Sequence, residues 1–420
     1  MAPRHHWPLD LKTPRIPLPV DQKQREIKPL VGCQTQFREN APIAQVLYNR
    51  FFKREALPLC RNELARSPMK QFRHNIIRAG LDALYFTGAY HVLRPIFSGI
   101  GTILMLHNVQ PPRTDAFQPN RHLEVTPQFL RATLRHLRSQ NIDIITMDEL
   151  HRRLTTREFG RRFACITLDD GYRDNRDFAL PVFEEFQAPF TVYAASDFAQ
   201  GTGRLWWITL ERLIAQNDSI ELPIGDAEIR LDTRTPDDKQ AAFDRLHALM
   251  RGLPGSDDLQ RTMATLCARY RTDDTAISRE LCLSWSELRS FAAHPLVTIG
   301  AHSITHGILA HQRESLVLHE MSVGRARIES NLDREIAHLA YPYGDRAAAG
   351  PREYALARRA GFKTAVTTRP GMLFPGVADH LTALPRVSLN GNYQNDRILP
   401  VLTSGAATAM WNGFRRVDAA

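Results

Sequence analysis

From residue 101 onward, short apolar segments alternate with longer amphipathic segments, and this alternation constrains the fold more than any other feature of the chain. The intervening segments have helical spacing; one of them, 127–140, begins with Pro127 directly after a capping Thr126. The apolar segments have the length and composition of strands: 102–107, 143–146, 163–168, 190–195, 296–301, 338–341, 363–368 and 384–389. Strands that alternate with helices form a parallel sheet covered by helices, so an α/β fold is predicted.

Three other parts of the chain depart from this alternation. Residues 201–283 are charged and compatible with helix, and we expect a mostly helical insertion between two strands. Residues 69–99 carry apolar side chains at helical spacing and are expected to form an amphipathic helical segment. This segment either packs on the main domain or makes peripheral contact with a membrane surface through residues 76–99. Residues 401–420 are expected to be a C-terminal tail.

Residues 1–68 differ from the rest in being rich in Pro, Gln, Asn and Arg, with little periodicity. We expect a poorly ordered N-terminal extension, because such a segment buries too little apolar surface to offset its ordering entropy. Met69 could be the initiator, so the extension is expected to be dispensable. The apolar stretch 41–52 keeps open the alternative that the extension folds as a cap over the site. No secretory signal or membrane-spanning run is recognised, which makes the cytoplasm the expected location.

The net charge of +9 results from 54 Lys and Arg against 45 Asp and Glu. Arginines are scattered along the chain without an aromatic-interleaved stripe, and we therefore expect no nucleic-acid partner. The five cysteines are odd in number, widely spaced and without a CxxC pair. They are typical of reduced thiols, and they favour neither a disulfide framework nor a thiolate zinc site.

Chemistry-bearing residues gather in three short motifs, each at the end of a predicted strand, where barrel enzymes carry their catalytic groups. In the first, Asp169 and Asp170 follow an apolar strand, and Gly171 permits a tight turn. Neighbouring carboxylates at a strand end diverge, so one can bind a metal while the other accepts a proton. Taken alone, such a motif is often only a turn. The three motifs are TLDDG (167–171), HSITH (302–306) and AYPYG (340–344).

The second and third motifs add ligands and a backbone donor. His302 and His306 are four residues apart, so on a helical turn they project from one face and can share a metal ion. Two histidines and one aspartate would form a three-ligand site with positions open for water and substrate. In the third motif, Pro342 fixes the backbone and Gly344 frees it, so Tyr343 can present its N–H toward such a site.

The ordered set TLDDG, HSITH and YPYG resembles the polysaccharide deacetylases of carbohydrate esterase family four, the NodB-homology group. The resemblance covers residues 100–390, with 201–283 as an insertion. It implies a distorted (β/α) barrel of about seven strands over residues 100–400, followed by the tail. It also implies one divalent metal ion, with Zn²⁺ the first choice and Co²⁺, Ni²⁺ or Mn²⁺ as alternatives.

The same resemblance assigns roles residue by residue. Asp169 would be the catalytic base, and Asp170, His302 and His306 would be the metal ligands. Ser303 would support the loop by hydrogen bonding, because it lies between the two histidines of the second motif.

The third motif departs from the common form of the family. Ala340 stands where an arginine usually holds the base, and Arg386 is a candidate replacement. Tyr343 would still supply the N–H that binds the oxyanion. The usual catalytic-acid histidine near the last strand is absent. His107 at the end of the first strand is the preferred candidate for that role, and His380 is the other.

The implied reaction is metal-assisted hydrolysis that releases acetate from a glycan containing N-acetylhexosamine, either chitooligosaccharide-like or an exopolysaccharide. Two alternatives stay open: removal of an O-acetyl or another acyl group by the same machinery, and a non-catalytic glycan-binding descendant. The complete set of aspartates and histidines argues against the second alternative. Trp206 and Trp207 could stack on sugar rings or be buried in the core. The oligomeric state is left open.

Overall fold

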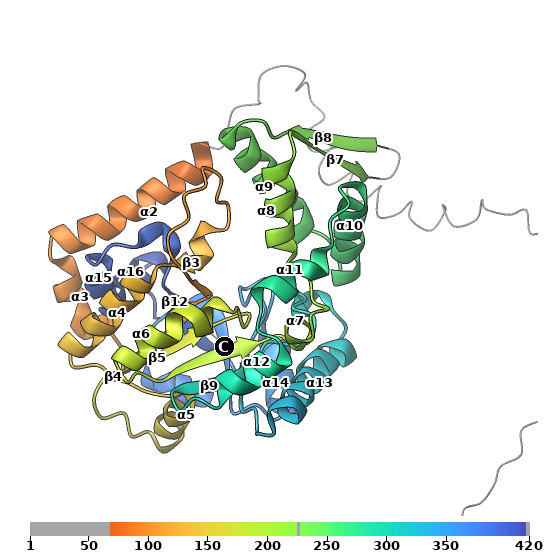
Figure 1. The fold of residues 1–420 in the computed structure, drawn as a ribbon. Coiled ribbons are helices and arrows are strands. Elements are labelled where there is room, and N and C mark those ends of the chain that lie inside the picture. Colours follow the sequence, from red (N-terminus) through yellow and green to blue (C-terminus); the bar gives the residue numbers. More distant parts are fainter. Residues whose placement is uncertain (1–67, 225–226, 417–420) are drawn as a thin grey trace, which may run out of the picture. The chain divides into compact units, whose positions relative to one another are not determined.

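A closed ring of parallel strands forms the centre of the molecule (Figure 1). The computed structural model describes residues 68–224 and 227–416, so the expected extension 1–68 lies outside the described residues except for Pro68. The ring runs in the order β1 (Gly101–Leu106), β12 (Leu384–Ser388), β11 (Thr364–Pro370), β10 (His338–Ala340), β9 (Val297–Ala301), β6 (Phe190–Ala194) and β5 (Phe163–Leu168). It closes where β1 pairs with β5, which confirms the predicted barrel of about seven strands.

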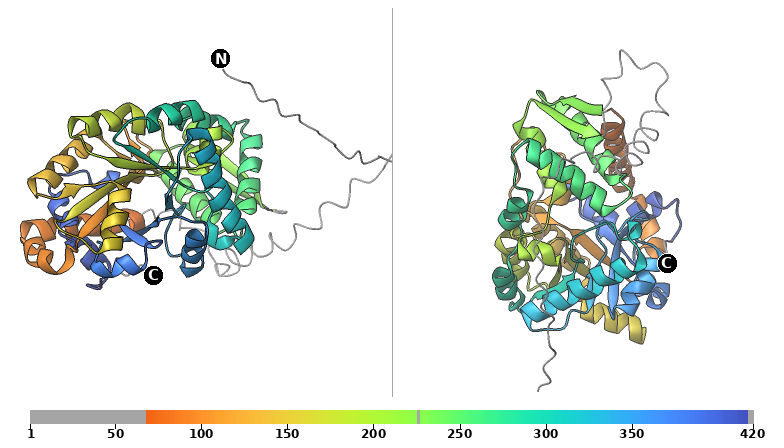
Figure 2. Two further views of the ribbon diagram at one scale, coloured as in Figure 1. Left: turned by 90° about the horizontal axis from the view of Figure 1, so that it is seen from below. Right: turned by 90° about the vertical axis from the view of Figure 1, so that its right-hand side faces the viewer.

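The strands are almost completely buried because the ring is filled with side chains and covered by helices. A further short strand, β4 (Asp143–Ile144), pairs only with the beginning of β5, whose end pairs with β6. Figure 2 shows the helices lying around the outside of the strands. These helices are α4 (Pro127–Ser139), α5 (Met147–Thr156), α6 (Leu180–Glu185), α7 (Ser196–Gln200), α12 (Trp285–Ala292), α13 (Glu314–Leu332) and α14 (Pro351–Arg359).

The helix α4 illustrates why these segments are helical. Thr126 caps it by accepting a hydrogen bond from the N–H of Phe129, and Pro127 occupies the first turn. Its buried side chains recur at helical spacing and pack into the main core: Phe129, Leu130, Leu134 and Leu137. Two short strands, β2 (Asn108–Val109) and β3 (Glu124–Val125), pair beside the barrel.

Residues 201–283 form the insertion, but not from helices alone. It contains α8 (Trp206–Gln216), α9 (Pro236–Arg251), α10 (Ser256–Arg269) and α11 (Asp274–Leu281). It also contains an antiparallel hairpin of β7 (Ser219–Ile224) and β8 (Ala227–Asp232), which the sequence analysis did not predict. The hairpin buries Ile220 and Leu222 on one face, a period of two that is short enough to be hidden in the charged sequence around it.

The end of the chain is also different from the expected tail at 401–420. Two helices, α15 (Ile398–Thr403) and α16 (Ala406–Trp411), lie there, and Val401 and Ala406 are fully buried. They pack against the segment 69–99, which forms α2 (Pro68–Phe86) and α3 (Ala89–Phe97). Small and apolar residues at helical spacing explain this packing, because they let neighbouring helices approach closely.

No described helix combines the length and the apolar composition needed to cross a bilayer. The cysteines that fall within the described ranges, Cys165, Cys267 and Cys282, are buried and free.

Candidate metal centre

The three motifs meet at one end of the barrel because each follows a parallel strand at its carboxyl end. Asp169 and Asp170 follow β5, His302 follows β9, and the AYPYG loop begins at the last residue of β10. Asp170, Ser303, His306 and Tyr343 all have positive φ angles, between 60° and 74°. A left-handed backbone is costly for residues other than glycine and is typical of functional sites, where the surrounding structure holds it in place.

Asp170, His302 and His306 converge on one point. The Oδ1 atom of Asp170 lies 3.3 Å from Nε2 of His302 and 3.2 Å from Nε2 of His306. All three side chains are buried, and their potential ligand atoms lie within 4.8 Å of one another. Two imidazoles and one carboxylate are ligands that a transition-metal ion such as Zn²⁺ accepts, with positions left for water and substrate.

The hydrogen bonding around these atoms fits a cation. Nδ1 of His302 lies 2.7 Å from the carbonyl oxygen of Ala340, and because a carbonyl only accepts, Nδ1 must carry the proton. In the neutral imidazole, the lone pair of Nε2 then faces Asp170, whose buried Oδ1 has no hydrogen-bond partner among the described residues. Nε2 of His302 and Oδ1 of Asp170 are both electron-rich, and a cation bound by both atoms would stabilise their close approach. The residues therefore fit the divalent ion that the sequence predicts.

The loop that carries the two histidines is hydrogen-bonded to α13. The carboxylate of Glu320 accepts hydrogen bonds from the N–H groups of Ile304 and Thr305, at 2.9 and 3.0 Å. Ser303 accepts a hydrogen bond from the N–H of His306, which is the supporting role expected for it. Nothing in the sequence singled out Glu320, because a glutamate on an amphipathic helix is usually on its solvent face.

Asp169 is held by Arg386, which stands on the last strand of the ring. Nη1 and Nη2 of Arg386 donate to Oδ1 and Oδ2 of Asp169, each at 2.7 Å, and both side chains are almost completely buried. Burial alone would raise the pKa of Asp169, but the charge and the two hydrogen bonds of Arg386 lower it. Arg386 thus makes the ion pair with Asp169 that Ala340 cannot make.

His107 directly follows β1, and its Nε2 lies 3.9 Å from Oδ2 of Asp169. Burial lowers the pKa of His107, and the nearby carboxylates of Asp169 and Asp170 oppose that effect. The other candidate acid, His380, precedes β12, so it lies toward the opposite end of the barrel and does not border the site. Of the two histidines, the structure brings only His107 to the aspartates.

Tyr343 joins the barrel to the insertion. Its hydroxyl accepts a hydrogen bond from Nε1 of Trp206 at 2.7 Å, and burial raises its pKa to about 12. The guanidinium of Arg251, at the end of α9, lies 4.3 Å from the centre of the Tyr343 ring. The backbone N–H of Tyr343 makes no hydrogen bond to any described residue, so it can serve a ligand. The sequence indicated Tyr343 but not Arg251, because their contact depends on how the insertion folds back.

The site opens into a cavity of about 330 Å³, a size typical of small-molecule sites. His107, Asp169, Asp170, His302 and the two tryptophans Trp206 and Trp207 line it. Both tryptophans are mostly buried, with exposed fractions of 4% and 6%, so they are walls of this cavity and not open stacking platforms.

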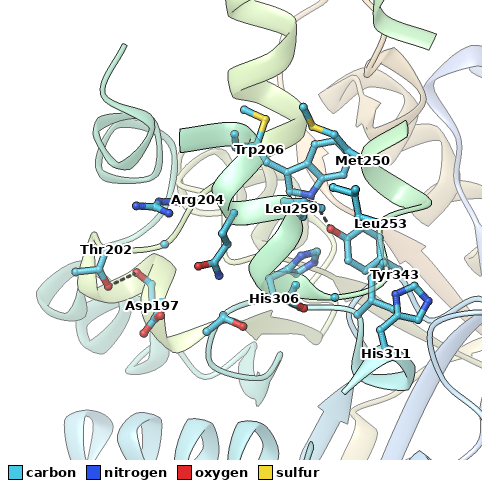
Figure 3. A pocket seen from close by; sticks show the side chains of 18 residues that line it. Asp197, Thr202, Arg204, Trp206, Met250, Leu253, Leu259, His306, His311 and Tyr343 are labelled. Carbon is cyan, nitrogen blue, oxygen red and sulfur yellow. Dashed lines mark hydrogen bonds between the residues drawn. The ribbon is translucent and has the colours of Figure 1, made fainter. Parts of the chain in front are cut away.

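Behind His306 lies a second, more polar cavity of about 290 Å³ between the HSITH loop and the insertion. Figure 3 shows the indole of Trp206 bonded to the hydroxyl of Tyr343 beside His306, and these three residues border both cavities. The wall of the candidate metal centre is therefore shared between the barrel and the insertion.

Residues 257–365 match the family model described as polysaccharide deacetylase. The match includes His302, His306 and Tyr343, whereas Asp169 and Asp170 precede it. No curated protein matches the chain in sequence.

Solved structures with a similar backbone include the Streptococcus pyogenes deacetylase PplD in complex with acetate, at 16% identity, with 69% of this chain and 92% of that chain covered and a TM-score of 0.46. A polysaccharide deacetylase from Bacillus cereus has 15% identity, coverage of 72% and 68%, and a TM-score of 0.46. IcaB from Ammonifex degensii has 17% identity, coverage of 73% and 96%, and a TM-score of 0.46.

Proposed function

We propose that this chain is a metal-dependent hydrolase that removes N-acetyl groups from glycans containing N-acetylhexosamine, as the match of residues 257–365 to the polysaccharide deacetylase model suggests. The products are acetate and a free amino sugar. The observation that carries the proposal is that the adjacent carboxylates of Asp169 and Asp170 face different partners. Asp170 faces two imidazoles, and Asp169 faces Arg386 and His107.

A divalent ion held by Asp170, His302 and His306 would polarise the acetyl carbonyl and lower the pKa of a water molecule. The protein supplies the remaining groups. Asp169 is kept ionised and oriented by Arg386, so it can accept the proton of the attacking water. The N–H of Tyr343 then donates a hydrogen bond to the oxygen on which negative charge develops.

His107 is the proposed acid. The C–N bond can break only if the leaving nitrogen gains a proton, and His107, which follows β1, has its Nε2 3.9 Å from Oδ2 of Asp169. Burial lowers the pKa of His107, and the negative charges of Asp169 and Asp170 offset only part of that effect, so His107 would give up its proton readily. One proton thus passes from water to Asp169, and another from His107 to the amine.

The cavity favours a sugar as the group that carries the acetyl. Its walls combine the indoles of Trp206 and Trp207 with polar side chains, including Asn120, His122 and Asn390. Sugar rings present both an apolar face and hydroxyl groups, so this mixture of aromatic and polar walls suits them.

The test is acetate release from a panel of N-acetylated and O-acetylated glycans. We expect release from N-acetylated members, and a loss of about 10²–10⁴-fold in Asp169→Asn with bound metal unchanged, because that is the usual contribution of a general base. Asp396→Asn, an exposed aspartate outside the site, is the matched control and should keep the wild-type rate. Release from O-acetylated members alone would replace the amide substrate by an ester, and a near-wild-type rate in Asp169→Asn would reject Asp169 as the base.

A further inference from the structure

Besides the polar cavity behind His306, two more cavities adjoin the candidate catalytic cavity. Each pair among these two and the catalytic cavity has lining residues in common. The first has a volume of about 450 Å³ and lies between α2, the end of β12 and the helices α15 and α16. The second has a volume of about 770 Å³ and lies between residues 345–347, which follow the AYPYG motif, the end of β11, and residues 411–416 at the end of α16 and after it. The shared residues are Ser388 and Asn390 for the catalytic and first cavities, Asp345 and Thr368 for the catalytic and second cavities, and Pro370 and Trp411 for the first and second.

The first cavity, which we call the apolar cavity, is lined mainly by hydrocarbon. Ile77 and Leu81 of α2 face Leu402, Ala407 and Trp411 from the end of the chain. Two of its polar side chains satisfy each other, because Nδ1 of His74 lies 2.9 Å from the hydroxyl of Tyr393. A hollow of this size and composition suits an alkyl or prenyl chain.

The second cavity, which we call the basic cavity, carries four arginines: Arg346, Arg369, Arg415 and Arg416. Asp345 is the only carboxylate among its described lining residues, and it is already paired with Arg251 at 2.7 Å. Within the described ranges, neither Arg346 nor Arg415 forms an ion pair. The guanidinium groups of Arg346 and Arg415, which line the same cavity, favour an anion with several oxygens, of which phosphate is the best match.

Resting on the proposed function, we propose that the substrate is an acetylated sugar joined through phosphate or diphosphate to a hydrocarbon chain. The sugar lies in the catalytic cavity, the phosphate in the basic cavity and the chain in the apolar cavity. The pairwise sharing of lining residues supports this arrangement, since one molecule with three chemically different parts can occupy three adjoining cavities. The reaction is unchanged: water cleaves the acetamide, and acetate leaves.

The surface around the apolar cavity suits a substrate that resides in lipid. Among the described residues, six of the eight large apolar side chains that are exposed belong to α2, α3 or the region of α16. They are Ile76, Phe86, Val92, Ile96, Trp411 and Phe414. This agrees with the peripheral membrane contact that the sequence suggested through residues 76–99, and it would let the chain of the substrate enter directly from the bilayer.

The test compares kcat/KM for acetate release by the full chain on three matched substrates: N-acetylglucosamine 1-phosphate carrying a short prenyl chain, the same sugar phosphate without the chain, and an alkyl N-acetylglucosaminide without phosphate. We expect the prenyl phosphate to be the best substrate. Each buried methylene should add about four-fold, and the phosphate about ten-fold or more. Equal values for all three would overturn the proposal.

Variants test which cavity binds the phosphate and which binds the hydrocarbon chain. Arg346→Ala with Arg415→Ala should reduce the ratio of kcat/KM between phosphorylated and phosphate-free substrates about ten-fold or more, whereas the exposed Arg230→Ala on β8 should not. Ala407→Trp should reduce the ratio between prenylated and chain-free substrates by filling the apolar cavity. Trp411→Ala tests the same cavity if Ala407→Trp does not fold, with the exposed Phe178→Ala as control.

The outcomes separate this inference from the proposed function. If soluble N-acetylated oligosaccharides release acetate as fast as the prenyl phosphate, and the cavity variants alter no ratio, the enzyme is a deacetylase but not one for lipid-linked sugars. If no acetylated substrate releases acetate, the proposed function itself fails.

Discussion

At the scale of single residues, the ion pair between Asp169 and Arg386 fixes the orientation of the Asp169 carboxylate. The two residues are 217 positions apart in the sequence, yet the guanidinium makes two parallel hydrogen bonds to the carboxylate in a fully buried setting. A planar fork of this kind fixes both the charge and the direction of the carboxylate, which a point charge cannot do. We therefore regard Arg386 as the positioning residue for Asp169.

This assignment predicts the behaviour of Arg386→Lys. The lysine keeps the positive charge but loses the paired hydrogen bonds, so kcat should fall about ten-fold or more while the metal content stays at the wild-type level. The exposed Arg358→Lys on α14 is the matched control. An unchanged kcat in Arg386→Lys would mean that the orientation of Asp169 by this residue is not needed.

The residues of the site differ in how well the sequence predicts them. Asp169, Asp170, His302, His306 and Tyr343 lie in contiguous motifs at strand ends, so their convergence follows from the strand order alone. Arg386 could only be named as a candidate, because its partner is fixed by the closure of the ring. Glu320 and Arg251 were not predicted at all, since each reaches the site through the packing of a helix and not through a local pattern.

At the scale of secondary-structure elements, the HSITH loop depends on its close contact with α13. Gly324 stands in the middle of this helix, and a Cβ atom there would lie 2.9 Å from the carbonyl carbon of Ser303. A glycine inside a helix costs about 1 kcal/mol relative to alanine. The close approach of α13 to the HSITH loop explains why glycine stands at position 324.

We accordingly expect Gly324→Ala to reduce acetate release and metal content, because the loop that carries His302 and His306 must shift. The free energy of unfolding should change by about 1 kcal/mol or less, since the gain in helix propensity offsets part of the clash. Ser330→Ala, on the exposed side of α13, provides the comparison. Wild-type metal content in Gly324→Ala would contradict a tight helix–loop contact.

A second element-level prediction concerns α12, which follows the insertion. Glu287 lies in its capping box with Ser284 and pairs with Arg173 and Arg176, which follow the TLDDG motif. The hydrogen bond from Arg173 lowers the pKa of Glu287 well below its ordinary value, against the smaller effect of burial. A lowered pKa in the folded state means that the carboxylate stabilises the protein above the ordinary pKa and that this contribution is lost as the pH falls.

The variant Glu287→Gln should therefore be less stable than wild type near about pH 7, and the difference should shrink toward about pH 3. Urea unfolding of both proteins at the two pH values measures it. A difference that is the same at both pH values would show that the charge of Glu287 does not stabilise the junction between barrel and insertion.

The elements themselves were predicted well where they repeat and less well where they do not. All strands of the ring coincide with apolar segments recognised in the sequence, because burial on both faces leaves a continuous apolar run. The hairpin of β7 and β8 and the final helices α15 and α16 were not expected. The hairpin is short and charged on one face, and the last helices are defined by packing against α2 and α3.

At the scale of the whole molecule, the barrel end and the insertion together form the site. The ring supplies the carboxylates and imidazoles, and the insertion supplies Trp206 and Arg251, which hold Tyr343. Strand alternation and motif order were sufficient to predict the ring and the end of it at which the three motifs meet. They could not predict the cavities beside it, because those arise where α2, α16 and the insertion fold back against the barrel.

The most direct test of the account is acetate release from an N-acetylated glycan by chelator-treated protein, before and after Zn²⁺ is added. We predict that release stops on chelation and returns with Zn²⁺ in wild type and in the exposed control His319→Ala, but not in His302→Ala, which lacks one of three ligands. Release that persists after complete removal of metal, or that returns equally in His302→Ala, would contradict a metal-dependent deacetylase centred on Asp170, His302 and His306.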